Sequence, residues 1–211
     1  QEALSVNRGL PAFLGGLVKG TPRFLVHYSS DQVFNGRKDS PYTEEDKADP
    51  ISLCGKSRLA GEQALLELNA DNICIIRTGW LFGPDGDSFL KRLLGQAKTE
   101  GTVEVIHDQI GSPTYAKDLA QATLQLVKRR APGLYHVANS GQATWCELAA
   151  EAVRQASLPC SVRAIASSDK TLRASYEVLS SAKYTALTGC TMRPWSQALR
   201  EYIYSVLLAS Q

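Results

Sequence analysis

The sequence predicts an α/β fold in which a parallel sheet is layered with helices and a smaller lobe packs beside it. Three observations support this prediction. Short apolar runs alternate with segments of helical period, and the helical segments are long enough to form right-handed crossovers between parallel strands. The last third of the chain then changes to shorter elements separated by polar loops.

The expected strands and helices follow from these patterns. Apolar runs predict strands of a single parallel sheet at 23–28, 72–78 and 103–106. Helical periodicity predicts helices at 10–19, 53–69 and 88–98, and the helix over 53–69 is expected to pack against that sheet.

The last third predicts helices over 116–130 and 144–156, strands over 134–137 and 161–165, and a terminal helix from Pro194. Thr144 and Glu147 have the spacing of a capping box, which predicts where the second of these helices begins. We therefore assign 1–115 to the sheet domain and 116–211 mainly to the smaller lobe, with the two interleaved.

Composition limits the classes of function. The 211 residues are 44% hydrophobic, and 23 basic residues nearly balance 21 acidic ones. The clusters of like charge are short, so neither nucleic acid nor a membrane is expected as a partner. The five cysteines are scattered without CxxC pairing, which favours reduced thiols, no metal site and a cytoplasmic protein.

Polar side chains follow the first expected strand directly. Ser29, Ser30 and Asp31 come after the apolar run, at the end of a parallel strand where open α/β sheets bind ligands. A turn with side-chain caps is the ordinary alternative for such a triplet.

Six blocks of sequence, in this order, carry a resemblance to a known family. They are SSDQVFNG, PYTEEDKADP, LCGKSRLAGE, RTGWLFGP, DQIGSPTYAKDLA and GLYHVANSGQATWCELA, and they span most of the chain. The series resembles dTDP-4-dehydrorhamnose reductase, an extended short-chain dehydrogenase/reductase. The resemblance implies a partial Rossmann-like sheet, a small substrate-binding lobe, NADP(H) as cofactor and a dTDP-hexose as substrate.

The resemblance also implies roles for particular residues. The hydroxyl that holds the substrate carbonyl falls on Ser30. The implied substrate-binding residues are Gln32, Val33, Phe34, Trp80 and Arg173, and the implied cofactor-binding residues are Ser29, Ser30, Arg58 and Thr78. For Trp80 the alternative is an ordinary core residue, and for Arg173 it is a solvated surface residue.

The two remaining catalytic positions differ from the family. Its proton-donating Tyr falls on Cys54 and its Lys falls on Arg58. Residues four apart share a helix face, so both are expected to face Ser30. A thiol is shorter than a phenol and a weak donor, and a guanidinium does not replace an ammonium directly. Gln32 and Glu177 also replace the family's Tyr and Ser.

The amino-terminal part also departs from the family. The family opens with a glycine-rich turn that binds the cofactor's pyrophosphate, whereas Gly15 and Gly16 lie in a segment of helical period. NADP(H) binding is therefore in doubt, and two hypotheses stay open. One is a weak or inactive nucleotide-sugar reductase, and the other is a catalytically silent relative that acts as a binding or regulatory subunit. Strands missing from the sheet would leave a flank that a partner chain or an oligomer covers.

Overall fold

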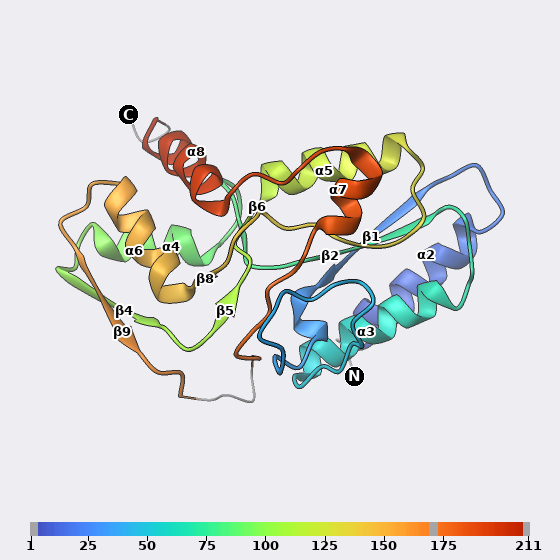
Figure 1. Ribbon diagram of the computed structural model, residues 1–211, viewed down its shortest axis with the longest axis horizontal. Helices are drawn as coiled ribbons and strands as arrows, with labels where there is room; N and C mark the ends of the chain where they lie inside the picture. Colours follow the sequence, from blue (N-terminus) through green and yellow to red (C-terminus); the bar gives the residue numbers. More distant parts are fainter. Residues whose placement is uncertain (1–3, 169–172, 209–211) are drawn as a thin grey trace.

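The computed structural model describes residues 4–168 and 173–208, which form two lobes beside each other (Figure 1). The larger lobe contains a parallel sheet in the order β1 (Leu25–Ser30), β2 (Ile73–Thr78) and β7 (Gly133–His136). Register pairs Ser30 with Thr78, so the carboxyl ends of β1 and β2 meet at one edge. The predicted α/β class is confirmed.

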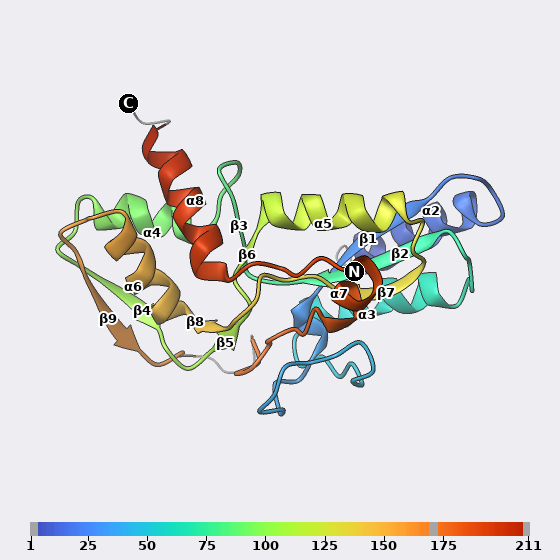
Figure 2. The same cartoon turned by 45° about the horizontal axis from the view of Figure 1, so that its top comes forward.

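Helices cover both faces of this sheet. A π-helical turn, η1 (Ser5–Gly9), leads into α2 (Leu10–Val18), which lies with α3 (Leu53–Leu66) on one face. The helices α5 (Ala116–Lys128) and α7 (Ala182–Thr188) lie on the other (Figure 1), and Figure 2 shows α5 and α3 on opposite sides of β2. All six residues of β2 are buried, as expected for a central strand covered on both sides.

The smaller lobe has its own sheet and core. Strands β4 (Thr102–Ile106) and β9 (Ser161–Ile165) pair in parallel. The helices of this lobe are α4 (Phe89–Ala97), α6 (Trp145–Gln155) and α8 (Trp195–Leu208). Their core includes Val103, Leu148, Leu199 and Tyr202. The predicted capping box at the start of α6 is confirmed.

The expectation that 103–106 joins the main sheet is wrong. In β4 only alternate residues, Val103 and Val105, are buried, which is the pattern of a strand covered on one face. Conversely, the strand expected at 134–137 is β7 and pairs with β2 in the main sheet, not in the smaller lobe. Each lobe therefore contains elements from both 1–115 and 116–211.

Short pairings join the two lobes. Strand β3 (Leu81–Phe82) pairs with β6 (Thr114–Tyr115), and β5 (Ile110–Gly111) pairs with β8 (Ala143–Thr144). The segment after Arg173 forms bridges from Tyr176 to Ile110 and from Leu179 to Tyr42. This segment therefore connects the loop after β1 with the smaller lobe.

One flank of the larger lobe is apolar and uncovered. Among the described strands, β1 pairs on one side only, with β2. Large apolar side chains of η1 and α2 are exposed nearby, at Val6, Leu10, Phe13, Leu14 and Leu17. No helix in the described part of the chain is long and apolar enough to cross a membrane.

Candidate functional site

The candidate site begins where β1 and β2 end. Ser30 is the last residue of β1, and Asp31 starts the 3₁₀ turn η2 (Asp31–Val33). The Ser30 hydroxyl donates to Asp31 Oδ1 over 2.7 Å and accepts from the Gln32 N–H over 3.2 Å. A hydroxyl and a carboxyl are thus fixed at the strand end, which is where parallel sheets bind ligands.

Asp31 is held beneath this edge in a buried position. Its side chain lies against Gly79, where a methyl group would overlap Asp31 Oδ2, so a larger residue there would require the Asp31 carboxyl to move. Burial raises the pKa of Asp31, while Arg173, the Ser30 hydroxyl, the Gln32 N–H and Arg58 act in the opposite direction. A buried carboxyl shared among these groups is unusual for a purely structural residue.

Trp80 follows β2 in a strained conformation. Its φ of 48° is rare for a bulky residue, and such strain persists only where the surroundings hold it. The ring stacks on Trp145 at the start of α6, with centroids 3.6 Å apart and planes at 5°. Gly111 packs directly against the Trp80 ring. The aromatic pair therefore connects the end of β2 with the smaller lobe.

Arg173 and Glu177 complete the cluster from the segment that connects the lobes. The Arg173 guanidinium lies 5.5 Å from the Trp145 ring centre, and its Nε is 3.7 Å from Glu177 Oε2. Burial and then the charge of Asp31 raise the pKa of Glu177 to about 8, against the opposing charge of Arg173. Beside Arg173 is a cavity of about 170 Å³ that Asn35, Ile51 and Gln109 also line.

Several buried polar atoms here have no hydrogen-bond partner in the described part of the chain, and we call them open atoms. They are Ser29 Oγ, Asp31 Oδ2, Arg58 Nε, Thr78 Oγ1, Trp80 Nε1 and Glu177 Oε2. Buried polar groups are nearly always bonded, so open atoms gathered at one strand edge indicate a place for a ligand.

Cys54 and Arg58, on which the resemblance places the family's Tyr and Lys, lie on the first turns of α3. Ser52 caps this helix by accepting from the Gly55 N–H, and Gly55 packs against the Gln32 carbonyl. Arg58 is half-buried, and its charge favours the ionised form of Asp31 and lowers the pKa of His27 on β1. Cys54 is an exposed free thiol. The structure thus brings Arg58 toward the cluster and leaves the Cys54 side chain at the surface.

The other residues implied by the resemblance occupy different environments. Val33 and Phe34 have fully buried side chains, and Phe34 stacks on Tyr42 with ring centres 4.0 Å apart. Gln32 is half-buried. The structure places Ser30, Trp80 and Arg173 in a single contact cluster through Asp31 and Trp145. Their roles stay predictions.

Sequence reasoning placed Asp31 at a ligand-binding strand end and noted that Glu177 replaces the family's Ser, but it gave neither a catalytic role and did not single out Trp145. The position of Asp31 directly after a buried strand was enough to predict a place near the site. Trp145 and Glu177 reach the cluster only through tertiary packing, so their sequence neighbours contain no equivalent signal.

Only one end of a dinucleotide has obvious partners among the described residues. The open atoms of Ser29, Thr78 and Arg58 lie where the strands end and suit the hydroxyls of a ribose. Gly15 and Gly16 lie inside α2, as expected, and Gly15 packs against Leu65. These two glycines form no phosphate-binding turn.

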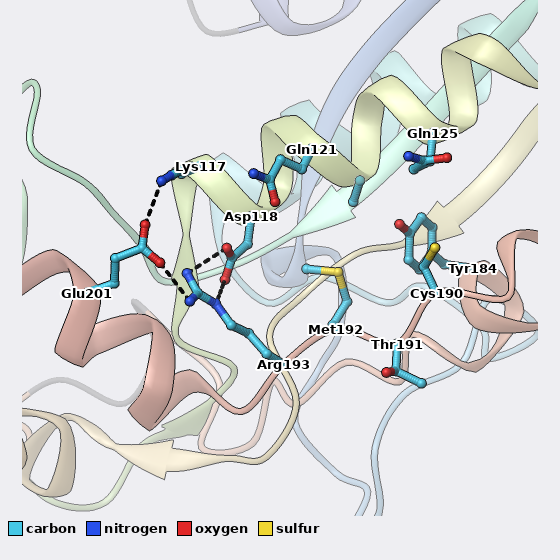
Figure 3. Close-up of a pocket in the computed structure, with 11 residues that line it drawn as sticks. Lys117, Asp118, Gln121, Gln125, Tyr184, Cys190, Thr191, Met192, Arg193 and Glu201 are labelled. Carbon is cyan, nitrogen blue, oxygen red and sulfur yellow. Dashed lines mark hydrogen bonds and ion pairs between the residues drawn. The ribbon is translucent and has the colours of Figure 1, made fainter.

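A second, larger cavity lies away from the strand ends. It has a volume of about 360 Å³ and lies between α5, α7, α8 and the loop at 190–193 (Figure 3). Arg193 bonds both carboxylate oxygens of Asp118 over 2.8 Å and lies 2.7 Å from Glu201, which also pairs with Lys117. These charges are paired with one another, which favours a structural role in holding α8 to α5.

Comparisons with known proteins agree with this geometry. The family described as RmlD substrate binding domain matches residues 1–208. The spore coat polysaccharide biosynthesis protein SpsK of Bacillus subtilis is 41% identical over 84% of this chain and 63% of its own length. The dTDP-4-dehydrorhamnose reductase of Mycolicibacterium smegmatis is 35% identical over all of this chain and 66% of its own length. The chain thus spans about two thirds of these relatives.

Solved structures support the same assignment. The dTDP-4-dehydrorhamnose reductase of Clostridium acetobutylicum has a TM-score of 0.89 and 31% identity, covering 95% of this chain and 72% of its own. The Bacillus anthracis enzyme, solved in complex with NADP, has a TM-score of 0.89 and 30% identity over 94% of this chain and 72% of its own. The chain therefore belongs to the RmlD-like family of dTDP-4-dehydrorhamnose reductases.

Proposed function

We propose that this chain is the substrate-binding part of an NADPH-dependent reductase for the 4-keto group of a dTDP-hexose, and that by itself it binds the sugar nucleotide with little or no turnover. The observation that carries this proposal is the cluster of open atoms around Ser30, Trp80 and Arg173, between the larger and the smaller lobe. The chain's free cysteines fit a reducing, cytoplasmic setting.

The residues of the site supply contacts for the substrate and the cofactor, but they supply no efficient acid for reduction. The Ser30 hydroxyl can donate to a substrate carbonyl, and Arg173 can pair with negative charge on the ligand. When bound, the dinucleotide supplies the hydride, and Ser29, Thr78 and Arg58 are the residues that fit its ribose. Reduction of a ketone also needs a positioned acid, because the carbonyl oxygen becomes an alkoxide. Cys54 is exposed and is a weak donor, so slow turnover is expected.

A binding or regulatory subunit is the second candidate. The free edge of β1 and the exposed apolar face of α2 favour it, because unpaired strand edges and large apolar patches are normally covered. On this hypothesis a partner chain or another copy packs on that flank, and the sugar site regulates the partner.

Calorimetry with dTDP-rhamnose tests the binding proposal. We expect measurable heat with this chain and at least tenfold weaker binding in Arg173→Met, because that change removes the cation beside the cavity. Arg200→Met is the matched control, since Arg200 lies exposed on α8, and its affinity should be unchanged. No heat at millimolar ligand from a folded protein would contradict the proposal.

NADPH oxidation separates the two candidates. Turnover of dTDP-4-dehydrorhamnose by this chain is expected to be absent or very slow, since loss of a general acid costs about 10²–10⁴-fold. The same assay on Cys54→Tyr/Arg58→Lys, and on any longer form that the gene encodes, shows whether the scaffold supports catalysis. Robust turnover by the unmodified chain would contradict the expectation that it has little or no catalytic activity. Inactivity of every form would favour the binding subunit.

A further inference from the structure

Two buried carboxyl groups from distant parts of the sequence interact with the same guanidinium, that of Arg173, and we call Asp31 and Glu177 the acid pair. Each residue is 1% exposed, and each has an open oxygen, Oδ2 in Asp31 and Oε2 in Glu177. One residue follows β1, and the other lies in the segment that connects the lobes. Their environment is therefore built by the fold and not by local sequence.

The charges around the acid pair do not satisfy both carboxylates. Arg173 acts on both members, from 3.7 Å in the case of Glu177, and Arg58 acts on Asp31 from α3. Ser30 and the Gln32 N–H bond Asp31 from the strand end. Two like charges that interact in a buried site do not both ionise readily, so the pair as a unit retains a proton.

The positions of these residues suggest a use for that proton. The family's acid is replaced at Cys54, whereas Glu177 adds a carboxyl where the family has Ser. Asp31 Oδ1 is 2.7 Å from the hydroxyl of Ser30, the residue expected to contact the sugar oxygen. A hydrogen bond therefore links Asp31 of the acid pair to Ser30, which is expected to lie at the reacting oxygen.

We propose that the acid pair stores the proton for ketone reduction and delivers it through Ser30, in place of the missing tyrosine. This inference rests on the proposed reductase function. Asp31 and Glu177 act through Ser30 and are positioning residues, while Ser30 is the group that touches the substrate.

The proposed step balances as follows. When bound, a dihydronicotinamide cofactor would supply the hydride that the carbonyl carbon gains, and the cofactor would be oxidised as the ketone is reduced. The Ser30 O–H bond breaks, and its proton bonds to the new alkoxide oxygen. The one proton of the acid pair passes to Ser30 Oγ from Asp31, after moving there from Glu177 where Glu177 holds it, and both carboxylates are then ionised beside Arg173. Solvent water returns one proton to the pair after the alcohol leaves.

Carbon-13 NMR of a glutamate-labelled sample tests the stored proton without any turnover. We expect one glutamate carboxyl to titrate near pH 8 in this chain and to vanish in Glu177→Gln. Asp31→Asn should move that titration at least one pH unit lower, because it removes the like charge. Titration of every glutamate below pH 6 in the unmodified chain would overturn the inference, and this measurement needs no variant to fold.

Binding experiments test whether the protonation of the acid pair changes when the ligand binds. When Ser30 bonds the sugar oxygen, Asp31 loses a hydrogen bond that favours its ionised form, so dTDP-rhamnose should bind with proton uptake near pH 8. Calorimetry in two buffers of different ionisation enthalpy measures that uptake. Binding without uptake would overturn the inference and leave the proposed function intact, whereas no binding at all would contradict the proposed function.

Steady-state kinetics of the longest form that the gene encodes test whether the acid pair delivers the proton through Ser30. Glu177→Gln is expected to lower kcat at least tenfold with KM changed less than twofold, and to remove a pH dependence near 8. Glu100→Gln, the matched control at an exposed glutamate, should change kcat less than twofold. Glu177→Asp should restore part of the rate. An unchanged kcat in Glu177→Gln would overturn the proposed delivery.

Discussion

The protein buries two clusters of charge, and they differ in how completely their atoms are bonded. In the first, Arg77 on β2 bonds Glu62 on α3, with its Nη2 2.6 Å from Oε2 and its Nε 2.9 Å from Oε1. His136 on β7 lies 3.4 Å from Arg77 Nη1 and 3.1 Å from the Tyr42 carbonyl. The second cluster is Arg173 with the acid pair, where the ion pair to Glu177 spans 3.7 Å and open oxygens face the interior.

This difference separates a structural cluster from a candidate functional one. In the Glu62 cluster the chain supplies the partners, so the charges are bound when the protein folds. His136 is neutral there, since burial and Arg77 lower its pKa to about 3. In the acid pair the bonding capacity is only partly used, which leaves it available to a ligand or a proton. Burial alone would not distinguish the two clusters.

Breaking the bonded cluster is expected to have the largest effect. Arg77→Met leaves Glu62 buried without its cation, and removing one partner of a buried ion pair costs about 3–5 kcal/mol in the free energy of unfolding. Urea denaturation measures this loss. The double variant Glu62→Leu/Arg77→Met should lose much less, because no uncompensated charge stays buried. A loss below about 1 kcal/mol in the single variant would contradict this account.

Replacing a member of the acid pair is expected to raise the free energy of unfolding at pH 8, whereas breaking the Glu62 cluster lowers it. The pKa of Glu177 is about 8 in the folded chain against an ordinary 4.5, so the folded state binds more protons between these values. Stability therefore falls as pH rises from about 4.5 to 8. Glu177→Gln should remove that fall and stabilise the protein at pH 8 by on the order of a few kcal/mol. Equal slopes in the two proteins would refute the shifted pKa.

The close contact beside the acid pair gives a smaller effect. A methyl group in Gly79→Ala overlaps Asp31 Oδ2, so the carboxyl must move within a packed site. Overpacking of this kind costs about 1–3 kcal/mol. Gly95→Ala is the matched control, because a methyl group there meets open space, and thermal unfolding should show no loss for it. Weakened dTDP-rhamnose binding in Gly79→Ala alone would tie the contact to the site.

The sequence predicted the α/β class and most element positions because these depend on local periodicity. It misassigned 103–106 because alternation of helices and strands does not say which strands pair, although the buried alternation of Val103 and Val105 was already present in the run TVEVI. The place of Ser30 at a ligand-binding strand end could be predicted from its position directly after an apolar run. The role of Glu177 could not be predicted in this way, since its raised pKa depends on burial and on the charge of Asp31, which lies far away in the sequence.

The smallest effects are expected in the paired charges of the second cavity. Arg193→Met removes two bonds of 2.8 Å from Asp118, which is largely buried, and bonds to a charged group contribute about 1–3 kcal/mol. Lys117→Met removes an ion pair that is solvent-exposed on both sides, so no measurable change is expected. Thermal unfolding at low and high salt checks both, and salt should not rescue Arg193→Met, because its loss comes from an unpaired buried acceptor. Equal losses in the two variants would mean that solvent exposure does not predict how much a charged contact contributes to the free energy of unfolding. Burial could then no longer be used to distinguish the acid pair from the bonded Glu62 cluster.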